Sequence, residues 1–415
     1  ANGAIVITTK RGSAGTGGIE YSNSFRMENT RAQPELQRTY GPTTSDGGTL
    51  GSFTYFGSPY ASGTTFYDNV DGFFRTALTQ RHNLAMSGGT ADNKMNYRLG
   101  LAADAQEGVV PTSDYGRINL TAATQGQVTS WLNADLSVQY AQADNNQSYK
   151  GANGPLIGLL LWPQTDDARD YLTPAGNRRR VTLLAPSTET DNPYFNVEKN
   201  RINSRNGRLI ANLSLTVTPF SWGSFKTIIG SDGYTNENTI LRHPESVYGN
   251  TLNGILDLAT DVTRNLNAQT LFNLNPQAIT KNLSISGLVG NQISDFRSNT
   301  EALKGQDFLD PNFVSVNNTN VRTNRTNLFQ RRLVSLFGQA TLNYADYLYL
   351  NLTGRNDWTS TIPVERNSFF YPSVSASFIF TSAFPSLGKV MTGKLRTAYA
   401  EVGKDARPYA YRPSL

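Results

Sequence analysis

The stretch from Ser335 to Phe380 decides the fold that this sequence predicts. It reads SLFGQATLNY at 335–344, ADY at 345–347, LYLNLTGRND at 348–357, a polar break, and FFYPSVSASFIF at 369–380. Apolar residues occupy every second position of each segment, as Val374, Ala376 and Phe378 do among serines. Successive side chains of a strand point to opposite faces, so each segment has one apolar and one polar face.

The polar face of these segments distinguishes two kinds of β protein. In a soluble sandwich we expect it to be rich in Lys and Glu, but here it is mostly Ser, Thr, Asn and Gln. Aromatic residues also stand near the segment ends. An apolar outer face, a polar inner face and aromatic ends are typical of strands in an outer-membrane barrel.

The composition agrees with an all-β membrane protein. Of 415 residues, 17% are charged and 38% hydrophobic, with 20 Tyr and no Cys. The longest apolar run, Leu156–Trp162, is far shorter than the ~20 residues of a membrane-spanning helix. A membrane protein without such helices must be a barrel. The net charge of +5 is dispersed, and the one tight basic run, Arg178–Arg180, is interpreted as part of a solvated loop rather than a nucleic-acid site.

Period-two alternation recurs along the whole chain. We predict about thirteen strands, each near the ~9–11 residues that a tilted spanning strand needs. Their ranges are 19–27, 81–89, 94–104, 115–124, 131–142, 207–218, 224–234, 262–272, 282–295, 333–344, 347–357, 369–381 and 393–402.

The connections between these strands alternate in length. One set is tight: 90–93, 125–130, 219–223, 273–281, 345–346 and 382–392. The other is mostly long: 28–80, 105–114, 143–206, 235–261, 296–332 and 358–368. This alternation predicts an up-and-down antiparallel transmembrane barrel, with tight turns in the periplasm and long loops outside. Trp131 and Trp222 adjoin tight turns and are assigned to the periplasmic aromatic belt.

The two ends of the chain predict an internal piece of a larger protein. Ala1–Gly12, ANGAIVITTKRG, reads as a short buried strand, and Gly12–Gly18 as a flexible connector. The strand count is odd, whereas bacterial single-chain barrels have even numbers. Since the first long connection follows the first strand, the chain enters from the periplasm, with Ala1–Gly18 there or inside the barrel.

The sequence contains four distinctive stretches: ANGAIVITTKRG at 1–12, QEG and SDYGRIN within 96–120, RND and PSVSASF within 336–380, and KLRTAYAEVG at 394–403. Together they resemble one family, the SusC/RagA-type TonB-dependent outer-membrane transporters. Ala1–Gly12 resembles the segment that closes their plug domain. Asn96–Leu120, with QEG and SDYGRIN, resembles a hairpin of their barrel. Leu336–Phe380, with RND and PSVSASF, and Lys394–Gly403, KLRTAYAEVG, resemble later strands. The sequence departs from the family after Asp357, where Trp358–Ile362 replaces the usual GSSRF, so no loop role is carried over there.

This resemblance implies a 22-stranded barrel with a plugged lumen, of which about thirteen strands are present. Residues 1–18 would be the last plug strand and its connector, and residues 19–415 the N-terminal part of the barrel, with the C-terminal strands missing. The implied function is active import of large nutrients such as oligosaccharides or peptides across the outer membrane. A SusD-like surface lipoprotein would act as a lid, and TonB would act through an N-terminal region absent from this sequence.

An enzymatic function and a cofactor are not expected. The two His, His82 and His243, are far apart and lie in no HExxH motif, and the lack of Cys excludes the common thiol sites. Asp68–Gly72, DNVDG, fails the spacing of a calcium loop and reads as a polar turn. No metal or nucleic-acid site is predicted.

Two groups of residues are candidate contacts. Arg355 and Asp357 share the inward-facing parity of their strand and would line the substrate cavity, brace the plug, or form a structural ion pair. Aromatic residues in the long outer loops would contact substrate or lid, or pack within their own loops; these are Trp162, Tyr55, Phe56 and Tyr60.

Other functions remain compatible with the pattern. A barrel of this family would also serve as a structural subunit of an outer-membrane assembly or secretion complex. A passive porin is disfavoured by the plug-like segment at Ala1–Gly12. A soluble β-solenoid would need a fixed repeat period, and none is found.

Overall fold

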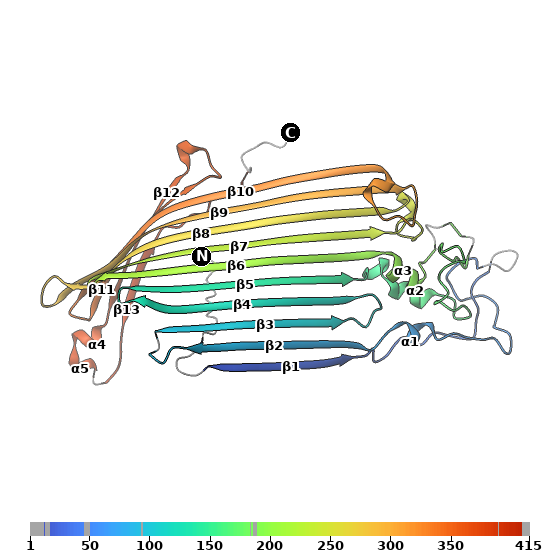
Figure 1. Ribbon diagram of the computed structural model, residues 1–415, viewed down its shortest axis with the longest axis horizontal. Helices are drawn as coiled ribbons and strands as arrows, with labels where there is room; N and C mark the ends of the chain where they lie inside the picture. The colour runs from blue at the N-terminus through green and yellow to red at the C-terminus, as the bar shows by residue number, and fades with distance from the viewer. Residues whose placement is uncertain are drawn as a thin grey trace.

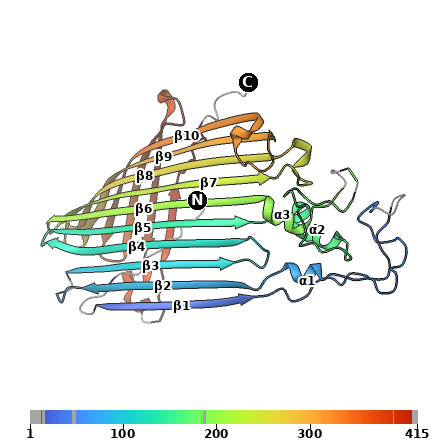
Figure 2. The same ribbon diagram turned by 45° about the vertical axis from the view of Figure 1, so that its right-hand side comes forward.

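A single curved antiparallel sheet makes up most of the protein. The computed structural model describes residues 12, 17–44, 50–92, 94–182, 184–185, 189–388 and 390–408. Within these residues the strands pair in sequence order, β1 to β13, and every pair is antiparallel. Figures 1 and 2 show β11–β13 turning behind β6–β9, so the sheet forms a trough with a convex and a concave side.

All thirteen predicted strands are present. Their bounds are β1 Gly18–Glu28, β2 Ala77–Gly89, β3 Met95–Glu107, β4 Asp114–Thr129, β5 Leu132–Gln147, β6 Arg201–Phe220, β7 Gly223–Arg242, β8 Ile255–Ala278, β9 Leu283–Phe308, β10 Thr319–Tyr344, β11 Leu348–Thr359, β12 Ser368–Phe378 and β13 Leu395–Ala400. The predicted plug strand and connector, Ala1–Gly18, lie almost wholly outside the described residues.

Several strands extend well beyond the predicted ranges, mostly toward the long connections, although β4 and β8 also extend toward their tight turns. β10 has 26 residues and begins at Thr319, whereas the alternation indicated a start at Leu333. Its additional part, TNVRTNRTNLFQRR, is polar on both faces, as expected for strand that stands in water beyond the apolar band. Alternation therefore marks only the part of each strand that would meet lipid.

The pairing register places the apolar parities of neighbouring strands on one common face. Leu352 of β11 lies opposite Ala340 of β10 and Val374 of β12, and Leu348 lies opposite Tyr344 and Phe378. The other face carries Thr353, which hydrogen-bonds to Ser373. We call these the outward and inward faces. They are the apolar and polar faces that the sequence predicts.

Most tight turns are as short as predicted, and aromatic residues gather beside them. Phe220 and Trp222 stack at a centroid distance of 4.9 Å next to the β6–β7 turn, and Trp131 lies at the β4–β5 turn. The connection between β12 and β13 differs, because it contains two short helices, α4 (Phe380–Ala383) and α5 (Pro385–Gly388).

The long connections pack together at the opposite end of the sheet. They contain α1 (Asn69–Phe73), α2 (Pro155–Leu161) and α3 (Pro193–Lys199), which lie beyond the ends of the strands in Figure 1. Short 3-10 turns lie at Gly151–Asn153, Asn250–Leu252, Val316–Asn318 and Val364–Arg366. None of the helices in the described part of the chain is long and apolar enough to cross a membrane.

Candidate functional site

The inward face brings the predicted pair Arg355 and Asp357 together. Arg355 Nε donates to Asp357 Oδ1 at 2.7 Å, and Nη2 donates to Ser335 Oγ at 2.7 Å. The guanidinium also lies over the ring of Phe337, 5.4 Å from its centroid. β11 supplies both charged residues and β10 supplies the other two, so the sheet register fixes this cluster.

A second inward ion pair lies next to this cluster and was not predicted. Asp405, in the segment after β13, accepts hydrogen bonds from Arg331 of β10 and Thr359 of β11, the latter at 2.8 Å. This contact ties the segment back onto the inward face. No local pattern in the sequence signals it, because Arg331 and Asp405 are distant in the chain.

The outer loops form a compact unit with its own core, which we call the outer loop cluster. Its residues come from the β1–β2, β5–β6 and β7–β8 connections, 29–76, 148–200 and 243–254. Val70 and Phe73 of α1 pack with Leu159 of α2 and Val197 of α3. Asn192 caps α3 by accepting hydrogen bonds from the backbone N–H groups of Tyr194 and Phe195.

A buried network of charges holds two of these connections together. The side chain of Arg178 is only 6% exposed and pairs with Glu189 and Asp191, which are still more buried. Asp191 in turn accepts from the backbone N–H of Val247 at 2.7 Å and from the hydroxyl of Ser246, both in the β7–β8 connection. The expectation of a solvated loop at Arg178–Arg180 is therefore wrong for Arg178. Its charge is buried because the fold brings the carboxylates of Glu189 and Asp191 against its guanidinium.

His243 is buried at the base of the same network. Its Nδ1 accepts a hydrogen bond from the backbone N–H of Glu245, and its ring packs edge-on against Phe195 at 5.4 Å. Burial, aided by the positive charge of Lys199, lowers the pKa of His243 from 6.5 to about 4. The folded cluster therefore holds the neutral imidazole.

We expect the outer loop cluster to weaken in acid. Between pH 6.5 and 4 the unfolded loop binds a proton that the folded loop does not, so stability present above pH 6.5 is lost as the pH falls toward 4. The loss is about 3 kcal/mol. Hydrogen exchange of residues 148–200 should be faster at pH 5 than at pH 7.5, after correction for intrinsic rates. His243→Asn should be less protected at pH 7.5 and lose this pH dependence, and an equal pH effect in both proteins would contradict the assignment.

The predicted aromatic residues take different places in the outer loop cluster. Trp162 is 3% exposed and donates from Nε1 to Asp166 at 2.9 Å, so it packs inside the cluster instead of presenting its ring at the surface. The hydroxyl of Tyr55 donates to the carbonyl of Leu161 at 2.6 Å, and its burial raises the Tyr55 pKa. Tyr60 packs edge-on against Phe66 at 5.0 Å. Phe56 is 89% exposed and remains available to a partner.

A hollow of about 520 Å³ lies within the outer loop cluster. It lies between residues 30–38 and the α1 segment, with Trp162 and Gln164 on its other side. Arg38 Nε donates to Gln164 Oε1 at 3.1 Å across it. Among the described residues no group of three or more His, Cys, Asp or Glu is placed to hold a metal ion.

The sheet, its two faces and its loop-bearing end define the class of protein: a barrel of the outer-membrane transporter type. Residues 143–415 match the family described as TonB dependent receptor-like, beta-barrel. The chain belongs to this family. Its members are receptors and transporters rather than enzymes, and their barrels lie in the outer membrane.

The individual relatives share only a small fraction of identical residues with this chain. TonB-dependent receptor P3 of Formosa agariphila is 22% identical over 424 residues, covering 99% of this chain and 40% of that protein. The RagAB peptide importer in its closed-closed state has a TM-score of 0.67 at 15% identity, covering 98% of this chain and 49% of the other. Its open-open state gives 0.63 at 14% identity, covering 94% and 47%. The chain thus spans less than half the length of these relatives, and the predicted SusC/RagA-type barrel fold is confirmed.

Proposed function

We propose that this chain forms the plug-proximal part of an outer-membrane importer that takes up oligosaccharides or peptides. In this proposal residues 1–18 end the plug, residues 19–415 form barrel wall, and TonB supplies the energy through another part of the protein. A SusD-like lipoprotein covers the outer loop cluster and delivers substrate to the inward face.

The observation that carries this proposal is the outer loop cluster itself. A buried apolar core joins the β1–β2 and β5–β6 connections, and a buried charge network joins the β5–β6 and β7–β8 connections, at the mouth of a polar inward face. Ordered loops with a core of their own provide a firm surface for a partner, because little conformational entropy is lost when the partner binds. The similarity to the RagAB peptide importer supports the same reading.

Import itself is tested in cells. A strain lacking the protein is compared with a complemented strain for uptake of fluorescent oligosaccharides and of fluorescent peptides. Uptake that requires the protein, and that stops when a protonophore collapses the proton gradient, supports the proposal. Normal uptake combined with loss of a secreted or surface-assembled product would overturn it in favour of a structural subunit of an assembly or secretion complex.

Arg355 and Asp357 are proposed to line the substrate path or brace the plug. Asp357→Asn would remove the negative charge that pairs with Arg355 and leave its guanidinium with neutral acceptors only, the amide oxygen of residue 357, Ser335 and Gln292. The matched control is Asp104→Asn, which breaks the inward ion pair between Arg81 and Asp104 on β2 and β3. Uptake reduced by Asp357→Asn alone supports a role of this pair in transport, and equal uptake leaves it a structural ion pair.

Phe56 is the aromatic residue proposed to contact the lid. Phe56→Ala should weaken the lipoprotein complex about tenfold, because an aromatic anchor at a protein interface typically contributes more than ~1 kcal/mol. Phe313→Ala is the matched control, since Phe313 is also exposed but lies in the β9–β10 connection. The affinities are measured by titrating the purified partners. Equal affinities for wild type and Phe56→Ala would exclude this contact.

A further inference from the structure

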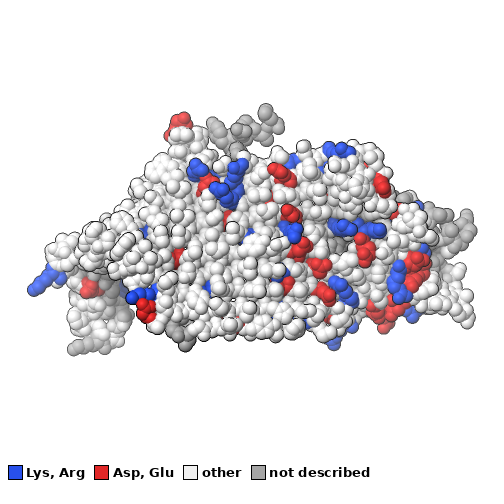
Figure 3. Space-filling view, viewed as in Figure 1, with Lys and Arg blue, Asp and Glu red and all other residues white. Residues whose placement is uncertain are grey.

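On the outward face of β8–β10, charged residues begin abruptly at one level. The outward positions of β9 from Leu283 to Ile293 carry no charge, and the next outward residue is Asp295. A span of this length matches the ~9–11 residues with which a strand crosses the hydrocarbon core. The first charged level therefore lies where the membrane gives way to its outer interface. Figure 3 shows that charged side chains are more frequent on the part of the sheet toward α1–α3 than on the part toward the tight turns.

Two arginines at this level face each other across strands. The register pairs Arg264 of β8 with Arg297 of β9, and Arg297 with Gln330 of β10. Like charges directly opposite each other in a sheet are destabilising. Within the described part of the chain, Arg264 and Arg297 form no ion pair and no side-chain hydrogen bond. Their repulsion is thus left uncompensated by the protein.

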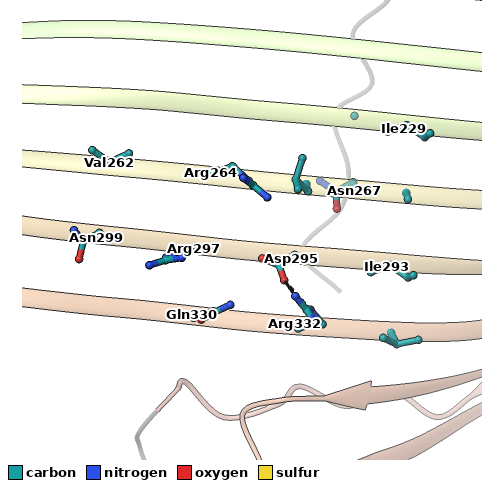
Figure 4. A pocket seen from close by; sticks show the side chains of 14 residues that line it. Ile229, Val262, Arg264, Asn267, Ile293, Asp295, Arg297, Asn299, Gln330 and Arg332 are labelled. Carbon is teal, nitrogen blue, oxygen red and sulfur yellow. Dashed lines mark hydrogen bonds and ion pairs between the residues drawn. The ribbon is translucent and has the colours of Figure 1, made fainter.

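A third arginine beside them is already neutralised. Arg332 of β10 forms an ion pair with Asp295, its cross-strand neighbour, and this is the dashed contact in Figure 4. Three arginines and one aspartate leave a local charge of +2. The excess resides on Arg264 and Arg297, which lie next to the ion pair in the same view.

These side chains surround a hollow of about 930 Å³ on the outward face. On its membrane side the lining is aliphatic and includes Leu266, Ile293 and Val334. On its far side Asn299 and Gln330 add amide groups that donate hydrogen bonds. The hollow therefore offers cations and amide donors next to apolar surface continuous with the lipid-facing band.

We propose that this hollow binds the phosphate group of a phosphorylated acyl lipid in the outer leaflet. Arg264 and Arg297 clamp the phosphate between them, because guanidinium groups bind phosphate oxygens through paired, charge-assisted hydrogen bonds. The acyl chains then lie along Leu266, Ile293 and Val334. A soluble anion would leave this aliphatic side unused.

The binding test uses the protein purified from its own outer membrane and stripped of lipid in detergent. Native mass spectrometry measures binding of dimyristoyl phosphatidic acid, of phosphatidylcholine with the same chains, and of inorganic phosphate. The variant is Arg264→Gln with Arg297→Gln, and the matched control is Arg205→Gln, an outward arginine of β6 outside the hollow. Heat-dependent gel mobility confirms that each barrel is folded, and the single variant Arg297→Gln replaces the double variant if that one does not fold.

Wild type and Arg205→Gln should bind phosphatidic acid at least ~10-fold more tightly than phosphatidylcholine, and the double variant should lose this preference. Equal binding of the two lipids by wild type, or an unchanged preference in the double variant, would overturn the proposal. Inorganic phosphate that binds as tightly as phosphatidic acid would also overturn it and indicate a site for a soluble anion. The inference rests on the proposed membrane position but not on import, so a failed uptake experiment with intact lipid preference would refute only the importer.

Discussion

Arg178→Ala is expected to open the outer loop cluster while leaving the strands of the sheet paired. The substitution removes the cation from two carboxylates that are almost fully buried, Glu189 and Asp191. Breaking a buried ion pair from one side typically costs 3–5 kcal/mol. Glu189 keeps Arg180 as a partner, so we expect a loss near the lower end, about 3 kcal/mol. Hydrogen exchange of residues 148–200 and 243–254 measures it.

The control for this prediction is another arginine of the same connection. Arg169 pairs with Asp167 on the surface, where its side chain is 70% exposed. An exposed pair contributes at most ~1 kcal/mol, so Arg169→Ala should leave hydrogen exchange nearly unchanged. Equal protection in the two variants would show that the buried network does not hold the loops together.

Leu159→Ala should destabilise the same cluster through its apolar core. Leu159 is fully buried between α1 and α3, in contact with Val70, Phe73 and Val197. Removing a buried leucine side chain costs about 2–5 kcal/mol through lost burial and the cavity that remains. If the loops reclose faster than they are cut, limited proteolysis of residues 148–200 should accelerate at least ~30-fold.

Leu156→Ala is the matched control, because Leu156 lies on the same helix but is 47% exposed. Both substitutions change the helix propensity of α2 by the same amount. Proteolysis of Leu156→Ala should therefore resemble that of wild type. Equal acceleration in the two variants would mean that α2 is held by its backbone contacts and not by the buried face.

The membrane-facing part of the fold was predictable from sequence because the alternation of apolar and polar residues can be seen within each strand alone. In β11, alternation alone assigned Leu350 and Leu352 to one face and Arg355 and Asp357 to the other, and the structure brings that charged pair together at 2.7 Å. The outer half of β10 was missed because outward residues such as Asn324 and Thr326 are as polar as the inward residue Thr323, so no apolar alternation marks it. This half is a strand because its backbone continues the antiparallel pairing with β9.

The packing of the outer loop cluster could not be predicted from the sequence pattern of any single segment. For Trp162 the sequence allowed contact with a partner or packing within the loops. The structure buries it beside a contact between Asn69 of α1 and the carbonyl of Pro163, which joins two connections far apart in the chain. Arg178 appeared as one of three consecutive basic residues, and only the fold supplies the carboxylates that bury it. The opposition of Arg264 and Arg297 likewise depends on the register of β8 against β9, which no single segment contains.

The unequal lengths of the strands give the entrance two unlike walls. β2 and β3 have 13 residues each, whereas β9 and β10 have 26 each, so one side of the rim stands much higher in continuous hydrogen-bonded sheet. The lower side is completed by the outer loop cluster, which is held by side-chain contacts. Movement of the β9–β10 side would require breaking the backbone hydrogen bonds between strands. Movement of the loops breaks no hydrogen bond between strands. The rim therefore combines one side of fixed height, set by strand pairing, with one side whose height depends on the packing of the loops.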